Sequence, residues 1–418
     1  MDILENSLNI YIYNPSLKTG GTNNLLANVA SLLANDGNLN VYYIDYKNSP
    51  VAKIVLKSNP RIIFIDYNDK DIISISSGIL ISTLLEIKII PEKLRLSEKT
   101  RLILWSTHPD DGLKIIPTFN LWLRWNIVFS RKIALILHPF FKKRIQKFLR
   151  VGIDNLGIVW MDDENFNANN LFYTLKRKPV ILPIFTKNPE NNNKLDKLSS
   201  SNNLKLVVLG RLTDFKIRPL YGLIQQIADY IKNTTKTVRI DFIGDGRYKN
   251  LVENWLINND IKNYNFLGHI DISDLDNKLM QYDLLIGMAT STLEGAKLHL
   301  PSVIIDASYK ILNKERVKLR WLYEVEPFHV CRIVGNNKQY EGRSFSNLMK
   351  DIDSNAEKQE VGLKCFEHWQ SYHSPDSINS LIKHTIDNNT FYFSEENQSL
   401  LKRDYISKIT DLLKKHFK

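Results

Sequence analysis

Cysteine is scarce in this sequence: of 418 residues only Cys331 and Cys365 are cysteines. Two thiols exclude a disulfide framework and a zinc site of several thiolates, and such low usage is typical of a reducing compartment. No His or Cys cluster has the spacing of metal ligands, and the scattered Asp-x-Asp pairs are what a charged surface produces by chance. We therefore expect no bound metal.

Long apolar runs are also missing. No stretch approaches the roughly 18 residues of a membrane-spanning helix. The longest uncharged stretch, Ile72 to Leu85, is broken by serines and a glycine and indicates buried core. The sequence starts Met1-Asp2-Ile3-Leu4-Glu5, acidic where a secretory signal is basic. These features predict a cytoplasmic protein.

Acidic residues are outnumbered by basic ones. Lys and Arg total 56 against 45 Asp and Glu, so the formal net charge is +11. This excess favours an anionic partner such as a nucleotide, a nucleic acid or a lipid headgroup. No known nucleic-acid motif accompanies it, so we expect no nucleic-acid partner. The 43% hydrophobic and 24% charged residues are ordinary for a globular protein and exclude a disordered, collagen-like or coiled-coil chain.

Short β-branched or aromatic runs alternate with helical patterns along the whole chain. The predicted strands are Asn9–Tyr13, Val41–Ile44, Ile62–Ile65, Leu102–Trp105, Ile133–Leu137, Gly157–Met161, Lys205–Leu209, Val238–Ile243, Asn265–Leu267, Asp283–Ile286 and Ser302–Ile305. Most are continuously hydrophobic, as strands covered by helices on both faces are. This α/β alternation predicts parallel sheets.

The composition changes once, in a polar stretch rich in Asn and Ser at 187–203 that is typical of a linker. We expect two doubly wound, Rossmann-like domains facing a cleft, over 1–186 and 204–385. Residues 386–418 form a Lys-rich tail with apolar residues at helical spacing. These are Leu401, Tyr405, Ile409, Leu412 and Leu413. This amphipathic helical tail is expected to pack back on the first domain.

The first candidate site is the turn after the first predicted strand, Gly20-Gly21-Thr22. Paired glycines let backbone approach backbone, and the following helix offers free N–H groups to an anion or a sugar hydroxyl. The turn is not a P-loop, because no Gly-Lys-Ser/Thr follows. It is not a dinucleotide-binding turn either, because the third glycine of that fingerprint is missing. The alternative is a tight turn that simply needs glycine.

The second candidate lies where strand Lys205–Leu209 ends in Gly210-Arg211, with Lys216 five residues on. Ligands of open α/β sheets bind beyond the carboxyl ends of the strands. Arg presents a planar fork to a diphosphate and Lys adds a mobile charge. The alternative is a solvated pair of surface charges.

The third candidate is the small-residue loop and helix start after strand Asp283–Ile286. It comprises Gly287, Met288, Thr290, Ser291 and Thr292, followed by Glu294. Ser and Thr at a helix start can cap it, and the N–H groups there would point at an anion. Glu294, expected in the first turn, could accept hydrogen bonds from ribose or sugar hydroxyls. The alternative is that Glu simply suits the helix dipole.

Two polar segments follow predicted strands of the first half. His108 lies just past Leu102–Trp105 and has a pKa suited to proton transfer; the alternative is a hydrogen-bonded structural histidine. Asp162, Asp163 and Glu164 follow Gly157–Met161 in the same way. One of them could face an acceptor, whereas a solvated acidic turn is the simpler interpretation.

A strongly basic segment extends from Asn120 to Arg150 and contains no acidic residue. Phe141, Ile145 and Phe148 could share one helical face, next to basic residues. The basic residues that would bind a membrane are Lys142, Lys143, Arg144, Lys147 and Arg150. A basic helix with an aromatic face is typical of binding to an anionic membrane surface. The alternative is a core-facing amphipathic helix whose cations are solvated.

The candidate motifs occur in a recognisable order. With Gly244-Asp245-Gly246 and Phe266-Leu267-Gly268, they resemble the nucleotide-sugar glycosyltransferases of the GT-B fold, specifically the large retaining family of polysaccharide and lipopolysaccharide synthesis. Gly20 and Gly21 match that family's Gly-Gly turn. Gly210, Arg211 and Lys216 match its strand ending Gly-Arg with a Lys a few residues on. The similarity is strongest from about Leu204 to Asp306.

The resemblance implies that Arg211 and Lys216 hold the donor diphosphate and Glu294 the ribose hydroxyls. The backbone from Gly287 to Thr292 would complete the anion site, with Gly244 beside it. Gly20, Gly21 and Thr22 would face the acceptor, and His108 and Glu294 are the catalytic candidates. The family's first glutamate, eight positions before the second, is here Ile286. That departure puts donor identity and retention of configuration in question.

These observations predict a metal-independent glycosyltransferase without a cofactor. Its partners would be a nucleoside diphosphate-sugar donor and a surface-glycan or lipid-linked saccharide acceptor. Peripheral association with an anionic membrane, at the inner face of the plasma membrane, would follow from the basic segment. Two alternatives remain, a nucleotide-sugar epimerase or hydrolase and a catalytically silent GT-B subunit.

Overall fold

The computed structural model describes residues 7–17, 20–68, 71–88, 90–116, 132–133, 136–189, 202–334 and 341–402. The chain divides into two compact units. Unit 1 comprises Met1–Pro183 and Ile378–Lys418, and unit 2 comprises Ile184–Ser377. The chain therefore crosses between units at 183/184 and 377/378, whereas the sequence pattern placed the domain limits at 186, 204 and 385.

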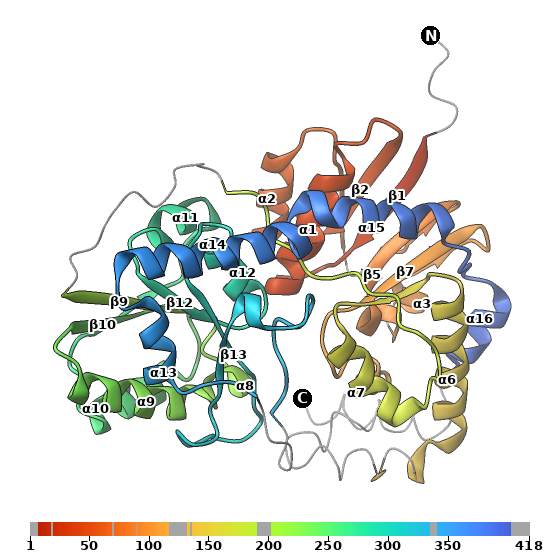
Figure 1. The fold of residues 1–418 in the computed structure, drawn as a ribbon. Helices are drawn as coiled ribbons and strands as arrows, with labels where there is room; N and C mark the ends of the chain where they lie inside the picture. The colour runs from red at the N-terminus through yellow and green to blue at the C-terminus, as the bar shows by residue number, and fades with distance from the viewer. Residues whose placement is uncertain are drawn as a thin grey trace. The chain divides into compact units, whose positions relative to one another are not determined.

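Unit 1 contains a six-stranded parallel sheet in the order β3-β2-β1-β5-β7-β8 (Figure 1). Its strands are β1 (Leu8–Tyr13), β2 (Leu39–Asp45), β3 (Ile63–Asp66), β5 (Gly78–Thr83), β7 (Thr100–Ser106) and β8 (Ile158–Trp160). Its main helices are α1 (Gly21–Leu33), α2 (Pro50–Ser58), α3 (Ile90–Lys93), α6 (Pro139–Asp154), α7 (Asp163–Tyr173) and α16 (Glu395–Leu400). Strands β4 (Ile73–Ile75) and β6 (Leu94–Leu96) form a separate pair.

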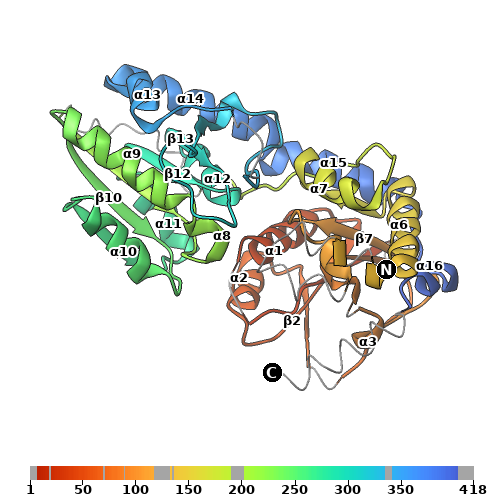
Figure 2. The same cartoon turned by 90° about the horizontal axis from the view of Figure 1, so that it is seen from below.

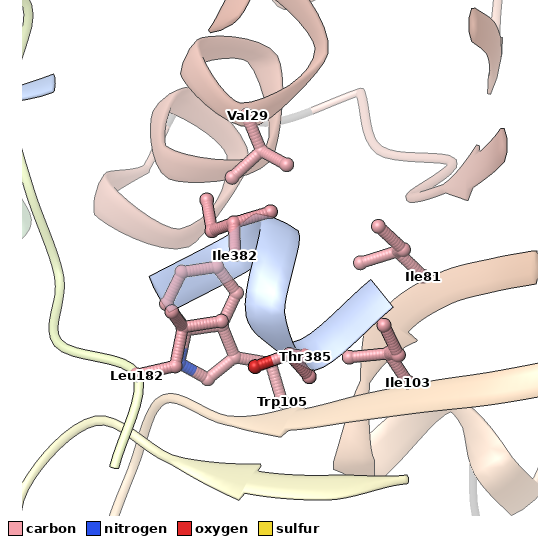
Figure 3. Close-up of a pocket in the computed structure, with 7 residues that line it drawn as sticks. All are labelled: Val29, Ile81, Ile103, Trp105, Leu182, Ile382 and Thr385. Atoms are coloured by element: carbon pink, nitrogen blue, oxygen red, sulfur yellow. The ribbon is translucent and has the colours of Figure 1, made fainter. Parts of the chain in front are cut away.

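Helices cover both faces of this sheet, as continuous hydrophobic strands require. Every residue of β5 is buried. On one face Leu80 packs in a core with Phe148 of α6 and Phe166 of α7. On the other, β5 and β7 face α1 and α15 (Pro375–Asn388) across a void of about 10 Å³ (Figure 3). The void is lined by Val29, Ile81, Ile103, Trp105, Leu182, Ile382 and Thr385. It contains no predicted site residue and is a packing gap of the core.

Unit 2 contains a second six-stranded sheet, in the order β11-β10-β9-β12-β13-β14. Its strands are β9 (Asn203–Leu209), β10 (Thr237–Ile243), β11 (Tyr264–Gly268), β12 (Leu284–Gly287), β13 (Ser302–Ile305) and β14 (Leu319–Trp321), of which β14 is antiparallel. Its helices are α8 (Asp214–Ile217), α9 (Leu220–Asn233), α10 (Lys249–Asn258), α11 (Ile272–Leu279), α12 (Thr290–Ala296), α13 (Phe345–Met349) and α14 (Asn355–Tyr372). Figures 1 and 2 show α9 and α10 on one face and α11, α12 and α14 on the other.

Five elements differ from the sequence prediction, among them the short paired strands β4 and β6, which were not predicted. The predicted strand Ile133–Leu137 is wrong, because its described residues 133, 136 and 137 are helical. The central strand β5 and the edge strand β14 were not predicted as strands. Residues 386–402 pack on unit 1, where Leu102 N donates to Phe391 O (2.8 Å) and Phe391 lies in the core. Four of the apolar residues predicted for the tail helix, Tyr405, Ile409, Leu412 and Leu413, lie outside the described residues.

Candidate functional site

In each sheet the chain first adds strands on one side of its first strand and then continues on the other side. The position where this change occurs is a topological switch point. In unit 2 the chain proceeds from β9 outward to β10 and β11, then returns to β12 on the other side of β9. The last residues of β9 and β12, Leu209 and Gly287, are paired in register. The carboxyl ends of such neighbouring strands form the usual binding crevice of an open α/β sheet. The second and third candidate motifs both start at this point.

Gly210 brings these two motifs together. Its φ of +151° suits glycine, and its N–H donates to Ile243 O (2.9 Å). A Cβ at Gly210 would lie 3.8 Å from Ser291 Oγ at the start of α12. The loop after β9 and the start of α12 are therefore side by side.

The two predicted cations, Arg211 and Lys216, come after Gly210 in the chain. Arg211 is exposed and Lys216, in α8, is half-buried. Burial, chiefly, and the charge of Arg211 lower the pKa of Lys216, against an opposing effect of Cys331. Among the described residues no carboxylate forms an ion pair with Lys216. A half-buried ammonium beside a second cation favours an anionic ligand.

Gly244 allows the loop after β10 to pack against the loop after β9. Its φ is +125°, and a Cβ there would collide with the carbonyl oxygen of Gly210. Leu212 N donates to Asp245 O (3.0 Å), so the Gly-Asp-Gly segment supports the backbone after β9. Gly244 thus acts by close approach of two backbones at the site.

The start of α12 differs from the prediction. The N-cap residue is Ala289, with φ +53° and ψ −127°, and no side chain caps the helix. Within the turn, Ser291 N donates to Met288 O (3.2 Å) and Thr292 N to Ala289 O (3.0 Å). Capping by Ser or Thr was therefore wrongly predicted, and these two N–H groups are already engaged. Gly287 and Met288 are buried, while Thr290 and Ser291 are half-buried.

Glu294 lies in the second turn of α12, not the first. Its Oε2 is 2.7 Å from Lys297 Nζ, which also lies 2.8 Å from Asp276 Oδ1. Burial alone would lower the pKa of Lys297, but the Glu294 and Asp276 carboxylates raise it. One carboxylate oxygen of Glu294 is thus held by a buried cation. Only the i, i+3 spacing of Glu294 and Lys297 could have indicated this pair from the sequence.

In unit 1 the corresponding reversal lies between β1 and β5. The Gly20-Gly21-Thr22 turn follows β1, and Gly20 is the N-cap of α1 with φ −177°. That extended backbone is open to any residue, so the backbone conformation at Gly20 does not require glycine. Thr22 Oγ1 lies 3.3 Å from Thr107 Oγ1. The structure therefore brings this turn next to the loop that carries His108.

His108 sits in a loop organised by a buried carboxylate. Asp111 accepts hydrogen bonds from Thr107 N (3.0 Å) and His108 N (2.9 Å), and burial raises the pKa of Asp111 to about 7. His108 Nδ1 accepts from Asp110 N (3.1 Å). In the neutral ring the hydrogen then lies on Nε2. In that form His108 can donate a hydrogen bond from Nε2, whereas donation of a proton requires the protonated ring.

The acidic turn after β8 is only partly solvated. Asp163 is exposed and Glu164 half-buried, but Asp162 is 1% exposed. Asp162 Oδ1 caps α7 by accepting from Asn165 N (2.6 Å), and burial raises the pKa of Asp162 to about 7. The interpretation of a solvated turn was wrong for Asp162.

The aromatic face predicted to meet a membrane is buried. Phe141, Ile145 and Phe148 of α6 are at most 3% exposed and belong to the unit 1 core. They cannot also form a lipid-facing surface, so that part of the prediction was wrong. Several of the basic residues have partners within the protein. Lys147 pairs with Glu396, Arg150 donates to the carbonyls of Thr174 and Leu175, and Lys142 and Arg144 lie over the rings of Phe172 and Phe141.

Neither a metal cluster nor a membrane span is found in the part of the chain that the structure describes. No three His, Cys, Asp or Glu side chains there converge as metal ligands would. No helix there combines the length and the apolar character needed to cross a bilayer.

Comparison with known proteins supports the fold. No protein-family model matches the sequence, and no curated protein matches it. WaaG, a glycosyltransferase involved in lipopolysaccharide biosynthesis, has a TM-score of 0.50 at 10% identity, covering 92% of this chain and 100% of WaaG. S. aureus TarM, solved with UDP, has a TM-score of 0.39 at 14% identity, covering 59% of this chain. The GtfA/B complex has a TM-score of 0.43 at 11% identity, covering 75% of this chain.

This chain spans about half of the structures matched first, 47% of TarM and 57% of the GtfA/B chain. At these identities the likeness concerns the fold. The predicted resemblance to GT-B glycosyltransferases is confirmed at that level, as is the prediction of two doubly wound α/β halves.

Proposed function

We propose that this protein is a glycosyltransferase that moves a sugar from a nucleoside diphosphate-sugar to a saccharide acceptor, either a surface glycan or a lipid-linked saccharide. The observation that carries the proposal is that Gly210, which the cations Arg211 and Lys216 follow in the chain, lies beside Ser291 at the start of α12. These residues lie where β9 and β12 end, the usual ligand position in this type of sheet. The GT-B fold is consistent with it.

Each residue has a role that follows from its chemistry. Arg211 and Lys216 would bind the donor diphosphate and stabilise its charge as the glycosidic bond breaks through an oxocarbenium-like state. Glu294 Oε2 is held by Lys297, so Oε1 would accept from a ribose hydroxyl. In unit 1, Thr22 and His108 would bind the acceptor, with His108 Nε2–H as donor. Retention of configuration and independence from metals are part of the proposal.

Peripheral attachment to an anionic membrane, on the cytoplasmic side, is a separate part of the proposal. Lys143 and Lys147 are exposed, and Phe140 beside them is 77% exposed. Flotation with anionic and with neutral lipid vesicles tests it. Binding to the anionic vesicles that Lys143→Glu weakens supports attachment, and equal recovery with both lipids contradicts it.

One observation favours a second candidate, a catalytically silent GT-B subunit. Where the resembling family has its first glutamate, Ile286 is fully buried within β12. An apolar side chain of the core therefore stands where that family usually has a carboxylate that contacts the donor sugar. Donor binding without turnover would identify this candidate, whereas release of free sugar or an epimer would identify a hydrolase or epimerase.

A thermal-shift screen against UDP, GDP, CMP and their common sugars tests the donor site. A ligand at 100 times its dissociation constant stabilises by about 2.7 kcal/mol. We expect one nucleotide class to raise the melting temperature and Arg211→Ala to abolish the shift. Lys314→Ala is the matched control, because it removes an exposed unit 2 cation paired with Asp229. No shift with any nucleotide contradicts the proposal.

A further inference from the structure

Two arginines that no sequence motif singled out converge on one carboxylate in unit 2. Asp306 follows β13 directly and is 4% exposed. Arg320 of β14 donates from one nitrogen to both of its oxygens (2.7 and 2.8 Å). Arg332 donates its backbone N–H to Asp306 Oδ1 (3.0 Å), and its Nε lies 3.6 Å from Oδ2. Asp306 thereby holds the guanidinium of Arg320 and the backbone of Arg332, with the Arg332 guanidinium close to its second oxygen.

The backbone around Arg332 runs along the edge of the sheet where the donor is proposed to bind. Ala289 N, at the start of α12, donates to Val330 O (3.0 Å). Ala307 N, just past β13, donates to Arg332 O (2.9 Å). The segment 330–332 therefore lies across the ends of β12 and β13, next to the loop that includes Gly287 and Met288.

These arginines and the predicted cations belong to one charged region. Cys331, which is half-buried, lies close enough to Lys216 and to Arg320 to influence both. Arg211 acts on Lys216 in the same way, and Arg332 acts on Arg320. Burial, the largest effect in each case, lowers the pKa of Lys216 and of Arg320. Several positively charged side chains are thus close together and partly removed from water, which costs free energy. A bound anion would offset that cost.

We infer that Arg332 forms the diphosphate subsite together with Lys216, and that Asp306 and Arg320 hold Arg332 in place for this role. The inference rests on the proposed function, because it assigns a further residue to the same donor site. A guanidinium offers two parallel N–H groups to a phosphate, which Lys216 cannot. The thiol of Cys331 then lies beside the bound diphosphate and becomes covered when the donor binds.

The two cysteines make this measurable on the whole protein. Iodoacetamide labelling is followed by mass spectrometry at Cys331 and Cys365, with and without a nucleoside diphosphate. Cys365 is an internal control, since it is fully buried and burial raises its pKa to about 12. We expect saturating UDP or GDP, whichever binds, to slow labelling of Cys331 at least about tenfold. The matching nucleoside, which has no phosphate, should give no protection.

Calorimetry on two Arg332 variants gives a readout that does not depend on thiol reactivity. Removing one charged hydrogen-bond partner costs about 1.5–3 kcal/mol, or roughly 10- to 100-fold in dissociation constant. We expect that loss with Arg332→Gln, partial recovery with Arg332→Lys, and no change with the control Lys314→Gln. Because Lys restores charge but not the fork, a merely structural role would not give this graded series in a folded protein.

The outcomes separate the two proposals. Normal nucleotide affinity in Arg332→Gln, in a protein where Arg211→Ala abolishes binding, overturns the inference and leaves the proposed function intact. Equal protection of Cys331 by nucleoside and nucleoside diphosphate also overturns it. Failure of every nucleotide to bind the wild type overturns both. If Arg332→Gln does not fold, the test uses the nucleotide affinity of Arg332→Lys and the protection of Cys331 in the wild type. Normal affinity in Arg332→Lys together with equal protection by nucleoside and nucleoside diphosphate then overturns the inference.

Discussion

The two units share one strand order but differ in what lies at the carboxyl edge of the sheet. In unit 2 that edge carries Arg211, Lys216 and Arg332. In unit 1 it carries His108 with the buried carboxyls of Asp111 and Asp162. The same topology therefore places a candidate site at each sheet edge, and in our proposal one binds the anionic donor and the other the neutral hydroxyl groups of the acceptor. Changes to either edge should affect different steps.

The largest expected effect comes from unit 1. We expect His108→Gln to lower turnover about 100- to 10,000-fold, the range of general acid–base catalysis, because Gln can replace the hydrogen bond from Nε2–H but cannot replace an imidazole that gains and loses a proton. The donor dissociation constant, measured by calorimetry, should not change. Unchanged turnover would show that His108 only positions its loop, and a changed donor affinity would contradict the division of roles between the units.

A buried charge group in unit 2 provides the next test. Lys297→Met leaves the carboxylates of Glu294 and Asp276 without the cation that joins them, which typically destabilises by about 3–5 kcal/mol. Urea unfolding measures the loss, and hydrogen exchange locates it. We expect loss of protection in unit 2 alone. Lys314→Met, which removes an exposed cation, should change the free energy of unfolding by less than about 1 kcal/mol.

Glycine requirements also distinguish the two edges. Gly244 has φ +125° and no room for a Cβ, so Gly244→Ala should cost about 1–3 kcal/mol and weaken nucleotide binding. Gly20 has φ −177°, so its backbone places no such demand on the residue there. We expect Gly20→Ala to leave the melting temperature nearly unchanged. Equal destabilisation by both substitutions would contradict this difference.

Acidification should move the stabilities of the two units in opposite directions. The folded pKa values of Asp111 and Asp162 are raised to about 7, so unit 1 loses stability as pH rises from about 4 to 7 and regains it on acidification. Burial lowers the pKa of His368 to about 4, so unit 2 loses stability as pH falls from about 6.5 to 4. Between the folded and unfolded pKa values, each group changes the free energy of unfolding by about 1.4 kcal/mol per pH unit.

Hydrogen exchange at pH 7 and pH 5, corrected for intrinsic rates, measures this for each unit. Asp162→Asn keeps the helix cap and should remove part of the pH dependence of unit 1. Changes of the same sign in both units would contradict the assignment of these buried groups.

Hydrophobic patterning predicted most strands to within two residues, for example β9, β10 and β13. It did not identify β5, because a buried uncharged run gives no periodicity that separates a strand from other core. It wrongly predicted a strand at Ile133–Leu137 for the same reason. The three-residue β14 has too short a pattern to detect, and with it Arg320 was missed.

The candidate site shows the same limit. The order of Gly210, Arg211, Lys216 and Glu294 was visible in the sequence, because these positions lie near the ends of predictable strands and helices. The partners of Glu294 and the contacts of Arg332 were not, since Asp276, Asp306 and Arg320 come from separate elements. The basic and aromatic pattern of α6 suits both a membrane and a protein core, and only the packing shows that the core holds its aromatic face.

The α/β class, the division into two halves and the positions where strands end in glycine or a charged residue could be read from the amino-acid sequence alone. These properties depend on local composition and periodicity. Which charges meet, which carboxyls are buried and which helical face is covered depend on the three-dimensional packing. Electrostatic and packing energies depend on distances between residues far apart in the chain, and those distances exist only once the sheets have assembled.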